Sequence, residues 1–280
     1  MLKRAGVLGW PVDHSLSPNI HRYWLNKYNI HGQYDRVPVE PKDFATKIQN
    51  LKTRGFVGGN VTVPHKQTAL KCVDEADPLA IRIGAVNTFV FRNDGSLYGF
   101  NTDGFGFLAN LTASQKNFNA SRGPAVVLGA GGAARAIIVA LQDAGVAEIR
   151  LLNRTQGRAQ DLADELQKPS VGKIQVLDWR SRADHLAGAN LLVNTTILGM
   201  KGQPSLDIDL SALPRDALVN DIVYAPLETN LLKLAKRNGH KVVDGLGMLL
   251  HQARPGFEAW FGPLPTVDNE LRTKILKGIG

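Results

Sequence analysis

The sequence contains little cysteine and no long uninterrupted apolar run. Cys72 is the only cysteine among the 280 residues. A single cysteine excludes an internal disulfide and a cysteine-based zinc site, and it is typical of a reducing compartment. The most apolar stretch, residues 125–141, contains Arg135 and three glycines, so it is too polar for a membrane-spanning helix. Because no signal sequence follows Met1, we expect a soluble cytoplasmic protein.

Acidic residues are in deficit. The 33 Lys and Arg outnumber the 25 Asp and Glu, which gives a formal net charge of +8. Such an excess suggests an anionic partner. However, the basic residues form no run and are not interleaved with aromatic residues, as they usually are in nucleic-acid-binding proteins. We therefore expect small anionic ligands and no nucleic acid, with a merely basic surface as the alternative.

The composition is otherwise that of an ordinary globular protein, with 44% hydrophobic and 21% charged residues. A chain of this length makes about two domains. Short apolar runs alternate with helical patterns, which predicts α/β architecture with mostly parallel sheets and right-handed crossovers. In the first half we expect strands at 5–9, 34–40, 56–63, 86–92 and 96–100, and helices at 17–29, 43–53 and 64–72.

A second unit begins near residue 124, after a connecting helix at 103–117. Its expected strands are 125–128, 148–152, 174–177, 190–194, 217–222 and 240–243, with a helix at 133–144. Two late helices are expected at 248–260 and 267–276.

A glycine-rich turn follows the strand at 125–128. Residues 129–134 read Gly-Ala-Gly-Gly-Ala-Ala and match the pattern G-x-G-x-x-A. The first glycine permits a tight turn, the second lets a pyrophosphate approach the backbone, and the small last residue lets the helix pack closely on the strand. The helix N-terminus supplies free N–H groups for the phosphates. The turn predicts a dinucleotide site, with a plain strand–helix turn as the alternative.

The end of the next strand indicates which dinucleotide is bound. An NAD enzyme usually has Asp or Glu here to hold the ribose 2′-hydroxyl. This chain has Asn153, Arg154 and Thr155 instead, followed by Arg158. If a helix begins at Thr155, the two guanidinium groups can converge on a 2′-phosphate. The absence of an acid favours NADP over NAD, and two solvated surface arginines are the alternative.

Three segments of the first half are rich in small polar residues. Ser15 and Ser17 stand at the start of a helix, where a carboxylate would bind well, although Ser17 could also be a simple N-cap. Lys66 falls in the first turn of the helix expected at 64–72, where the helix dipole disfavours a cation, so it is either functional or an ordinary surface lysine. Asp103 could pair with Lys66 and accept substrate hydroxyls, or cap a helix.

Several motifs, in this order along almost the whole chain, closely resemble those of the NADP-dependent shikimate dehydrogenases. They are His-Ser-Leu-Ser-Pro at 14–18, Asn-Val-Thr-Val-Pro-His-Lys at 60–66, Gly-Ala-Val-Asn-Thr at 84–88, Asn-Thr-Asp at 101–103, the glycine turn, Asn-Arg-Thr at 153–155 and Asp-Gly-Leu-Gly-Met-Leu-Leu-His-Gln-Ala at 244–253. The chain departs from the family at Arg22, which usually is Asn, and at Pro78, where some members have an acid. Neither position belongs to the catalytic pair.

The resemblance implies a fold and a division into domains. It predicts an N-terminal α/β substrate domain with a mostly parallel sheet, a Rossmann-type NADP-binding domain, and a cleft between them. The substrate domain would be discontinuous, comprising residues 1–103 and 247–280, and the NADP domain would comprise residues 104–246.

The resemblance also implies a role for individual residues, and no metal. The catalytic pair is Lys66 and Asp103. The substrate-binding residues are Ser15, Ser17, Thr62, Asn87, Asp103, Tyr224 and Gln252. The NADP-binding residues are Gly129, Ala130, Gly131, Gly132, Ala133, Asn153, Arg154, Thr155, Arg158, Ile222 and Gly245.

The activity implied by the resemblance is the reversible, NADPH-dependent reduction of 3-dehydroshikimate to shikimate in chorismate and aromatic amino acid biosynthesis. Protonated Lys66 can give a proton to the developing alkoxide, while Asp103 orients it. One alternative is a quinate/shikimate dehydrogenase that also uses NAD. Another is an NADP(H)-sensing regulatory protein, which would be expected to have lost Lys66 or Asp103. The sequence leaves the oligomeric state open, with a homodimer as one option.

Overall fold

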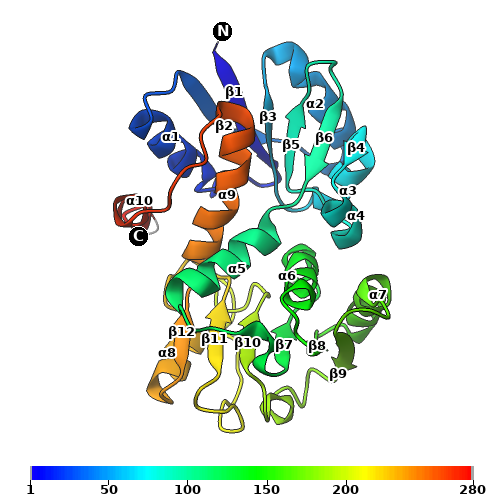
Figure 1. Cartoon of the computed structure of the whole chain (residues 1–280), viewed down its shortest axis with the longest axis vertical. Coiled ribbons are helices and arrows are strands. Elements are labelled where there is room, and N and C mark those ends of the chain that lie inside the picture. Colours follow the sequence, from blue (N-terminus) through cyan, green and yellow to red (C-terminus); the bar gives the residue numbers. More distant parts are fainter. Residues whose placement is uncertain (1, 279–280) are drawn as a thin grey trace. The chain divides into compact units, whose positions relative to one another are not determined.

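The computed structural model describes residues 2–278. They form two compact units, each built on a six-stranded sheet (Figure 1). The first unit comprises the chain up to Gly106 together with Leu250–Gly278, and the second comprises Phe107–Leu249. The chain therefore leaves the first unit and returns to it after completing the second.

The first sheet has the strand order β2-β1-β3-β5-β6-β4. Its strands are β1 (Lys3–Gly9), β2 (Gly32–Pro38), β3 (Gly58–Val61), β4 (Glu75–Ala76), β5 (Thr88–Phe91) and β6 (Leu97–Phe100). β1 runs parallel to β2 and β3, and β4 runs parallel to β6. Only β5 runs against its neighbours, as the hairpin turn between β5 and β6 requires.

Helices cover this sheet by burying regularly spaced apolar side chains. They are α1 (Ser17–Lys27), α2 (Phe44–Asn50), α3 (Lys66–Cys72), α4 (Pro78–Ile83), α9 (Leu246–Phe261), α10 (Asn269–Leu276) and the short 3₁₀ helices η1 (Pro41–Asp43) and η2 (Lys52–Arg54). Phe44 and Ile48 of α2, one turn apart, pack on Leu8 of β1. Trp24 of α1 meets Phe257 of α9 edge to face, with ring centroids 5.4 Å apart. Each such fully buried side chain stabilises the fold by about 1.5–3 kcal/mol.

The second sheet is entirely parallel and has the order β12-β11-β10-β7-β8-β9. Its strands are β7 (Ala125–Leu128), β8 (Glu148–Leu152), β9 (Lys173–Leu177), β10 (Leu191–Asn194), β11 (Leu218–Asp221) and β12 (Lys241–Val243). Its helices are α5 (Asp103–Ser114), whose first turn belongs to the first unit, α6 (Gly132–Asp143), α7 (Gln156–Leu166), α8 (Asn230–Arg237), and the 3₁₀ helices η3 (Ala120–Arg122) and η4 (Asp184–Leu186). This is the doubly wound order of a Rossmann fold, in which ligands bind where the strand order reverses, here between β7 and β10.

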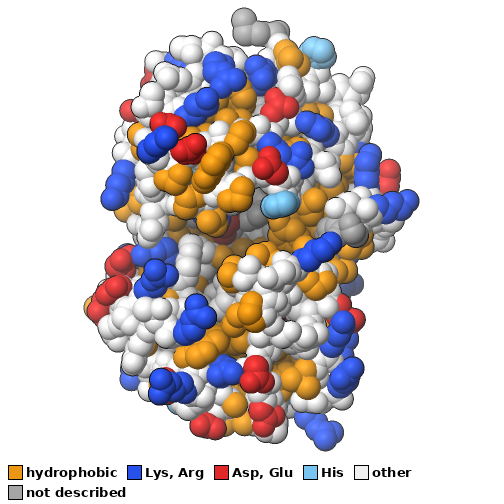
Figure 2. Space-filling model, turned by 180° about the vertical axis from the view of Figure 1, so that it is seen from behind, with side chains coloured by type: hydrophobic (Ala, Val, Ile, Leu, Met, Phe, Trp, Pro, Cys, Tyr) orange, Lys and Arg blue, Asp and Glu red, His pale blue; other side chains and the backbone are white. Residues whose placement is uncertain are grey.

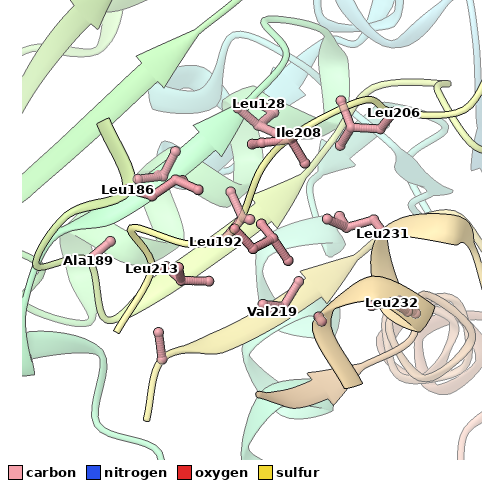
Figure 3. Close-up of a cluster of buried hydrophobic side chains, with 14 of the residues drawn as sticks. Leu128, Leu186, Ala189, Leu192, Leu206, Ile208, Leu213, Val219, Leu231 and Leu232 are labelled. Atoms are coloured by element: carbon pink, nitrogen blue, oxygen red, sulfur yellow. The ribbon is translucent and has the colours of Figure 1, made fainter. Parts of the chain in front are cut away.

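The strands of this sheet read as continuous apolar runs because both of their faces are covered. All four residues of β7, of β10 and of β11 are buried. On one face Leu128, Leu192 and Val219 lie against Leu231 and Leu232 of α8 (Figure 3). The loop before β11 closes the same cluster with Leu206, Ile208 and Leu213.

The structure differs from the sequence-based expectation at several helix boundaries. Leu16, not Ser17, is the N-cap of α1, and α1 begins at Ser17. Ser15 Oγ accepts a hydrogen bond from the Ser17 backbone N–H, one of the free N–H groups at the start of α1, at 3.3 Å. α3 begins at Lys66 rather than at Pro64. The short α4 and β4 and the amphipathic α8 were not predicted.

The described residues lack a membrane-spanning helix and a cluster of metal-binding side chains. Within residues 2–278 no helix is both long and apolar enough to cross a membrane. The same residues contain no group of three or more His, Cys, Asp or Glu that could hold a metal ion.

Candidate functional site

The polar segments of the first unit meet at one edge of its sheet. β1 and β3 run parallel, so the loops that follow them leave the sheet at the same edge. β5 runs in the opposite direction and β6 runs back, so the start of β5 and the end of β6 also lie there. This places Ser15, Thr62, Asn87 and Asp103 on connections at a single edge, although 88 residues of chain separate the first from the last.

Lys66 and Asp103 form an ion pair at this edge. Lys66 Nζ donates a hydrogen bond to Asp103 Oδ2 at 2.5 Å. The Lys66 side chain is 18% exposed and that of Asp103 is 2% exposed. The lysine therefore keeps limited access to solvent while its partner is buried. A buried carboxylate needs such a partner, because an unpaired buried charge is strongly destabilising.

Asn87 holds the other oxygen of the carboxylate. Its Nδ2 donates to Asp103 Oδ1 at 2.7 Å and to Thr102 Oγ1 at 3.0 Å. Its Oδ1 accepts the backbone N–H of Thr102 at 2.9 Å. The Asp103 side chain thus faces Lys66 and Asn87 rather than capping the helix that begins at Asp103. The resulting geometry fixes the rotamer of Asp103 and, through it, the position of the Lys66 ammonium group.

The serine loop after β1 is braced by β2 and β3. Arg36 donates two hydrogen bonds, from Nε and NH2, to the Ser15 carbonyl oxygen at 3.2 and 2.7 Å. A Cβ atom on Gly9 would lie 2.5 Å from Thr62 Cγ2, so only glycine lets Thr62 approach this loop. Ser15 and Ser17 are half-buried. Two hydroxyl groups beside the N-terminus of α1 form a suitable seat for a carboxylate.

The two remaining predicted substrate residues lie in different units. Gln252 is a half-buried residue of α9 in the first unit. Tyr224 belongs to the second unit, where burial raises the pKa of its hydroxyl group. Their roles toward a substrate stay predictions.

The glycine turn of the second unit lies between β7 and α6. Gly129 has φ +109°, and a Cβ atom there would lie 2.6 Å from Thr195 Oγ1, so this position requires glycine. Gly131 is the N-cap of α6, and because it has no side chain it leaves the first backbone N–H groups of the helix without a side-chain cap. A Cβ on Gly131 or Gly132 would meet no atom within 4 Å. Open space beside uncapped N–H groups fits a pyrophosphate, with Ala130 and Ala133 in the same turn.

The turn after β8 carries the two arginines. Asn153 Nδ2 donates to the Thr155 carbonyl oxygen at 2.8 Å, which braces the turn, and Thr155 is the N-cap of α7. Arg154 and Arg158 are exposed, and neither guanidinium group pairs with another described residue. Two unpaired cations and no acid at the end of β8 fit the 2′-phosphate of NADP better than a free ribose 2′-hydroxyl.

Ile222 and Gly245 are neighbours, as expected of residues that share one site. A Cβ on Gly245 would lie 2.1 Å from the Ile222 carbonyl oxygen, so the close approach requires glycine. The residue before Ile222 is the buried Asp221, which accepts hydrogen bonds from Asn194 Nδ2 at 2.9 Å and from Thr229 Oγ1 at 2.7 Å. Sequence reasoning did not find this polar cluster.

Sequence reasoning also missed several polar residues that surround the Lys66–Asp103 pair. Asn101 Oδ1 accepts the Asp103 backbone N–H at 3.0 Å, and Thr102 bonds to Asn87. Asn60 and Thr88 form part of the same network. Their position inside the quoted motifs was a signal, because each stands within one or two residues of a predicted site residue. Tyr34, whose hydroxyl group donates to Asn60 Oδ1 at 2.6 Å, lies outside all the quoted motifs.

Comparison with known proteins assigns the family. The profile described as "Shikimate dehydrogenase substrate binding domain" matches residues 7–89, and that described as "Shikimate / quinate 5-dehydrogenase" matches residues 112–198. The shikimate dehydrogenase (NADP(+)) of Paramagnetospirillum magneticum is 56% identical over 272 residues, which cover 97% of each chain. That of Rhodospirillum rubrum is 54% identical over 97% of this chain and 96% of the relative.

The chain belongs to the shikimate dehydrogenase family. Its fold matches that of quinate dehydrogenase from Corynebacterium glutamicum in complex with NAD, with a TM-score of 0.90, 33% identity and 99% coverage of both chains. Shikimate 5-dehydrogenase from Thermus thermophilus in complex with NADP(H) and shikimate matches with a TM-score of 0.85, 37% identity and complete coverage of both chains.

Proposed function

We propose that this chain is an NADP-dependent shikimate dehydrogenase, which reversibly reduces 3-dehydroshikimate to shikimate for aromatic amino acid biosynthesis. The observation that carries the proposal is the Lys66–Asp103 pair, held at the edge of the first sheet with Asn87 on the second carboxylate oxygen. The names of the relatives in the same family, at 54–56% identity, support it.

NADP is the cofactor that these residues fit. Gly129 to Ala133 would hold the pyrophosphate at the N-terminus of α6, and Asn153, Arg154, Thr155 and Arg158 would hold the 2′-phosphate. Ile222 and Gly245 would lie beside the nicotinamide. When bound, NADPH supplies the hydride for the carbonyl carbon.

The chain itself handles the proton and the orientation of the substrate. Lys66, protonated at neutral pH, would donate a proton to the substrate carbonyl oxygen as negative charge develops on it. Asp103 would hold the ammonium group in place and accept a ring hydroxyl. Ser15 and Ser17 would bind the substrate carboxylate, with Thr62, Asn87, Tyr224 and Gln252 binding the ring hydroxyls. A site that binds these hydroxyls by hydrogen bonds discriminates strongly against analogues that lack them.

A second candidate, a quinate dehydrogenase that uses NAD, is favoured by the likeness to the Corynebacterium glutamicum enzyme. The turn after β8 opposes it, because Arg154 and Arg158 replace the acid that would hold the NAD ribose. A regulatory NADP(H)-binding protein is disfavoured by the retention of both Lys66 and Asp103. Nucleic acid is not expected as a partner. On the face of the molecule drawn in Figure 2, Lys and Arg side chains are mixed with Asp and Glu rather than gathered in one stripe.

The deciding experiment measures kcat/KM for shikimate and for quinate, each with NADP and with NAD, from the absorbance of the reduced cofactor. The highest value is expected for shikimate with NADP. Turnover of quinate with NAD as the best combination would replace the proposal with the second candidate.

Three further properties form part of the proposal. The substrate domain would consist of residues 1–103 and 247–280, and the NADP domain of residues 104–246. The enzyme would act in the cytoplasm, where its anionic substrate and NADPH are made and used. A homodimer is one option for the oligomeric state, and sedimentation equilibrium tests it directly, since a monomer mass would contradict it.

A further inference from the structure

We propose that Tyr34, Asn60 and Thr88 are positioning residues for this reaction. They act through a buried chain of side-chain hydrogen bonds that runs from Tyr34 to the catalytic Asp103. The inference rests on the proposed dehydrogenase function and adds residues that touch neither substrate nor cofactor.

The chain of hydrogen bonds is continuous. The Tyr34 hydroxyl group donates to Asn60 Oδ1 at 2.6 Å, and Asn60 Nδ2 donates to Thr88 Oγ1 at 3.1 Å. The Thr88 hydroxyl group donates to Asn87 Oδ1 at 2.8 Å, and Asn87 Nδ2 donates to Asp103 Oδ1 at 2.7 Å. Four hydrogen bonds thus join a residue of β2 to the partner of Lys66, across β3 and β5.

The directions of the bonds follow from two backbone contacts, and one of these, the Thr102 N–H donating to Asn87 Oδ1 at 2.9 Å, fixes the Asn87 amide. Asn60 Nδ2 lies 3.3 Å from the Asn87 carbonyl oxygen, which can only accept, so the amide nitrogen must face that side. Asn60 Oδ1 therefore faces Tyr34, and the Tyr34 hydroxyl group must donate to it. Burial raises the pKa of Tyr34, so its hydroxyl group keeps the proton that it donates to Asn60.

All the donors consequently point the same way, toward the Asp103 carboxylate. Hydrogen bonds in such a head-to-tail series polarise one another, so each strengthens the next. The low dielectric of the surroundings favours this, because Tyr34 and Thr88 are completely buried. The Tyr34 ring is held independently of its hydroxyl group by stacking on His21, with centroids 4.0 Å apart.

The chain fixes the position of the Asp103 carboxylate, which in turn holds the Lys66 ammonium group. Loss of one link would therefore misplace the reacting group without removing a contact with the substrate. Such a loss affects kcat rather than KM, because a small misplacement of a catalytic group slows the chemical step.

The test compares Thr88→Val with Thr88→Ser. Valine keeps the shape of threonine and removes the hydroxyl group, whereas serine keeps the hydroxyl group and removes the methyl group. For Thr88→Val we expect kcat to fall about tenfold or more, which corresponds to one buried hydrogen bond. The KM values for shikimate and NADP should change by less than about threefold, and Thr88→Ser should restore kcat to within about threefold of the wild type.

Ile48→Val removes one methyl group from the hydrophobic cluster under α2 and controls for a general loss of stability. It should lower the melting temperature without lowering kcat. A Thr88→Val enzyme that is folded and has wild-type kcat would overturn the inference, as would an equal loss of kcat in Thr88→Val and Thr88→Ser.

A double-mutant cycle tests whether the chain acts as a unit. Tyr34→Phe should lower kcat/KM in the otherwise wild-type enzyme, but the fold-loss should be at least about threefold smaller in a Thr88→Val background, because the chain is already broken there. Equal costs in the two backgrounds would refute the coupling. Wild-type protein that does not oxidise shikimate with NADP would refute the proposed function itself, a result distinct from either of these.

Discussion

At the scale of single residues, the chemistry depends on where charge is placed relative to backbone dipoles. Lys66 is the first residue of α3, where the helix dipole disfavours a cation. The contact with Asp103 at 2.5 Å offsets that cost and fixes the ammonium group. His65, its neighbour, has a structural role instead: its Nε2 lies 2.7 Å from the Val39 carbonyl oxygen and its ring stacks on Phe44. Burial lowers the pKa of His65, which keeps a second cation away from the site.

The role of Lys66 predicts a specific kinetic defect. In Lys66→Ala we expect kcat to fall by about 10²–10⁴-fold, the usual contribution of a positioned proton donor. The dissociation constant for shikimate should change by less than about tenfold, because the serines and hydroxyl-binding residues remain. Stopped-flow turnover and fluorescence titration with shikimate measure the two quantities. Lys71→Ala, an exposed lysine on the same helix, is the matched control. Near-normal turnover in Lys66→Ala would remove the lysine from the mechanism.

At the scale of elements, the carboxyl ends of parallel strands bring distant polar residues together. Asp221 ends β11 and Asn194 ends β10, and these ends are in register. Thr229, the N-cap of α8, donates its hydroxyl group to Asp221 and accepts the Leu232 backbone N–H. One carboxylate thus joins two strands and a helix beside the predicted nicotinamide residue Ile222. Burial outweighs the three hydrogen bonds to Asp221 and raises its pKa to about 6.

This raised pKa predicts a pH-dependent stability difference. Between about pH 4 and pH 6 the folded protein keeps a proton that the unfolded chain has lost, so the contribution of Asp221 to stability falls as pH rises. Over this range the contribution of Asp221 to the unfolding free energy falls by ~3 kcal/mol, because its pKa differs by about two between the folded and the unfolded chain and each pKa unit corresponds to about 1.36 kcal/mol. In Asp221→Asn this loss is absent. The unfolding free energy of the variant, relative to wild type, should therefore increase from pH 4 to pH 7.

Urea unfolding at several pH values measures the difference. Asp161→Asn, on the exposed face of α7, controls for the removal of one negative charge. A difference between Asp221→Asn and wild type that does not change across this pH range would contradict the titration of Asp221 in that window.

At the scale of the whole molecule, the net charge of +8 is distributed rather than concentrated. Basic side chains are scattered among acidic ones on the face in Figure 2. Many are neutralised locally, as in the pairs Arg92–Glu75 and Lys236–Glu228. Arg154 and Arg158 are exposed without an acidic partner among the described residues, and both belong to the turn after β8 and the first turn of α7. Total charge is thus a poorer guide to the ligand than the position of these two arginines at the end of β8.

The two arginines predict how NADP stabilises the whole protein. NADP at about 100 times its dissociation constant should raise the unfolding free energy by about 2.7 kcal/mol, which a melting curve detects. In the double variant Arg154→Ala/Arg158→Ala, the dissociation constant for NADP should rise by about 10²-fold or more, since each charge-assisted bond contributes about 1.5–3 kcal/mol. Binding of NAD should change by less than about threefold. Calorimetric titration measures both.

Arg215→Ala/Arg237→Ala removes the same charge from exposed positions of the same unit and serves as the control. An equal loss of NADP and NAD affinity in Arg154→Ala/Arg158→Ala would show that these arginines do not read the 2′-phosphate.

Local features could be predicted from the sequence because their causes are local. The requirement for glycine at Gly129 follows from its positive φ in a tight turn, and the missing acid after β8 can be read directly from Asn153 and Arg154. The alternation of strands and helices predicted α/β architecture with parallel sheets, since apolar periodicity reflects which faces are buried. Helix starts were less predictable: Ser17 has the residue type of an N-cap, yet Ser15 bonds to its N–H group instead.

By itself, then, the sequence determined the α/β class, the glycine turn after β7 and the identity of the Lys66–Asp103 pair. Only the tertiary structure decided what surrounds that pair. Tyr34 and Asn60 meet because β1 lies between β2 and β3, and the strand register sets Tyr34 opposite Ala5 and Asn60 opposite Val7. A hydrogen bond between residues 26 positions apart leaves no periodic trace in the sequence. It exists because backbone pairing across the sheet sets distances that no local pattern encodes.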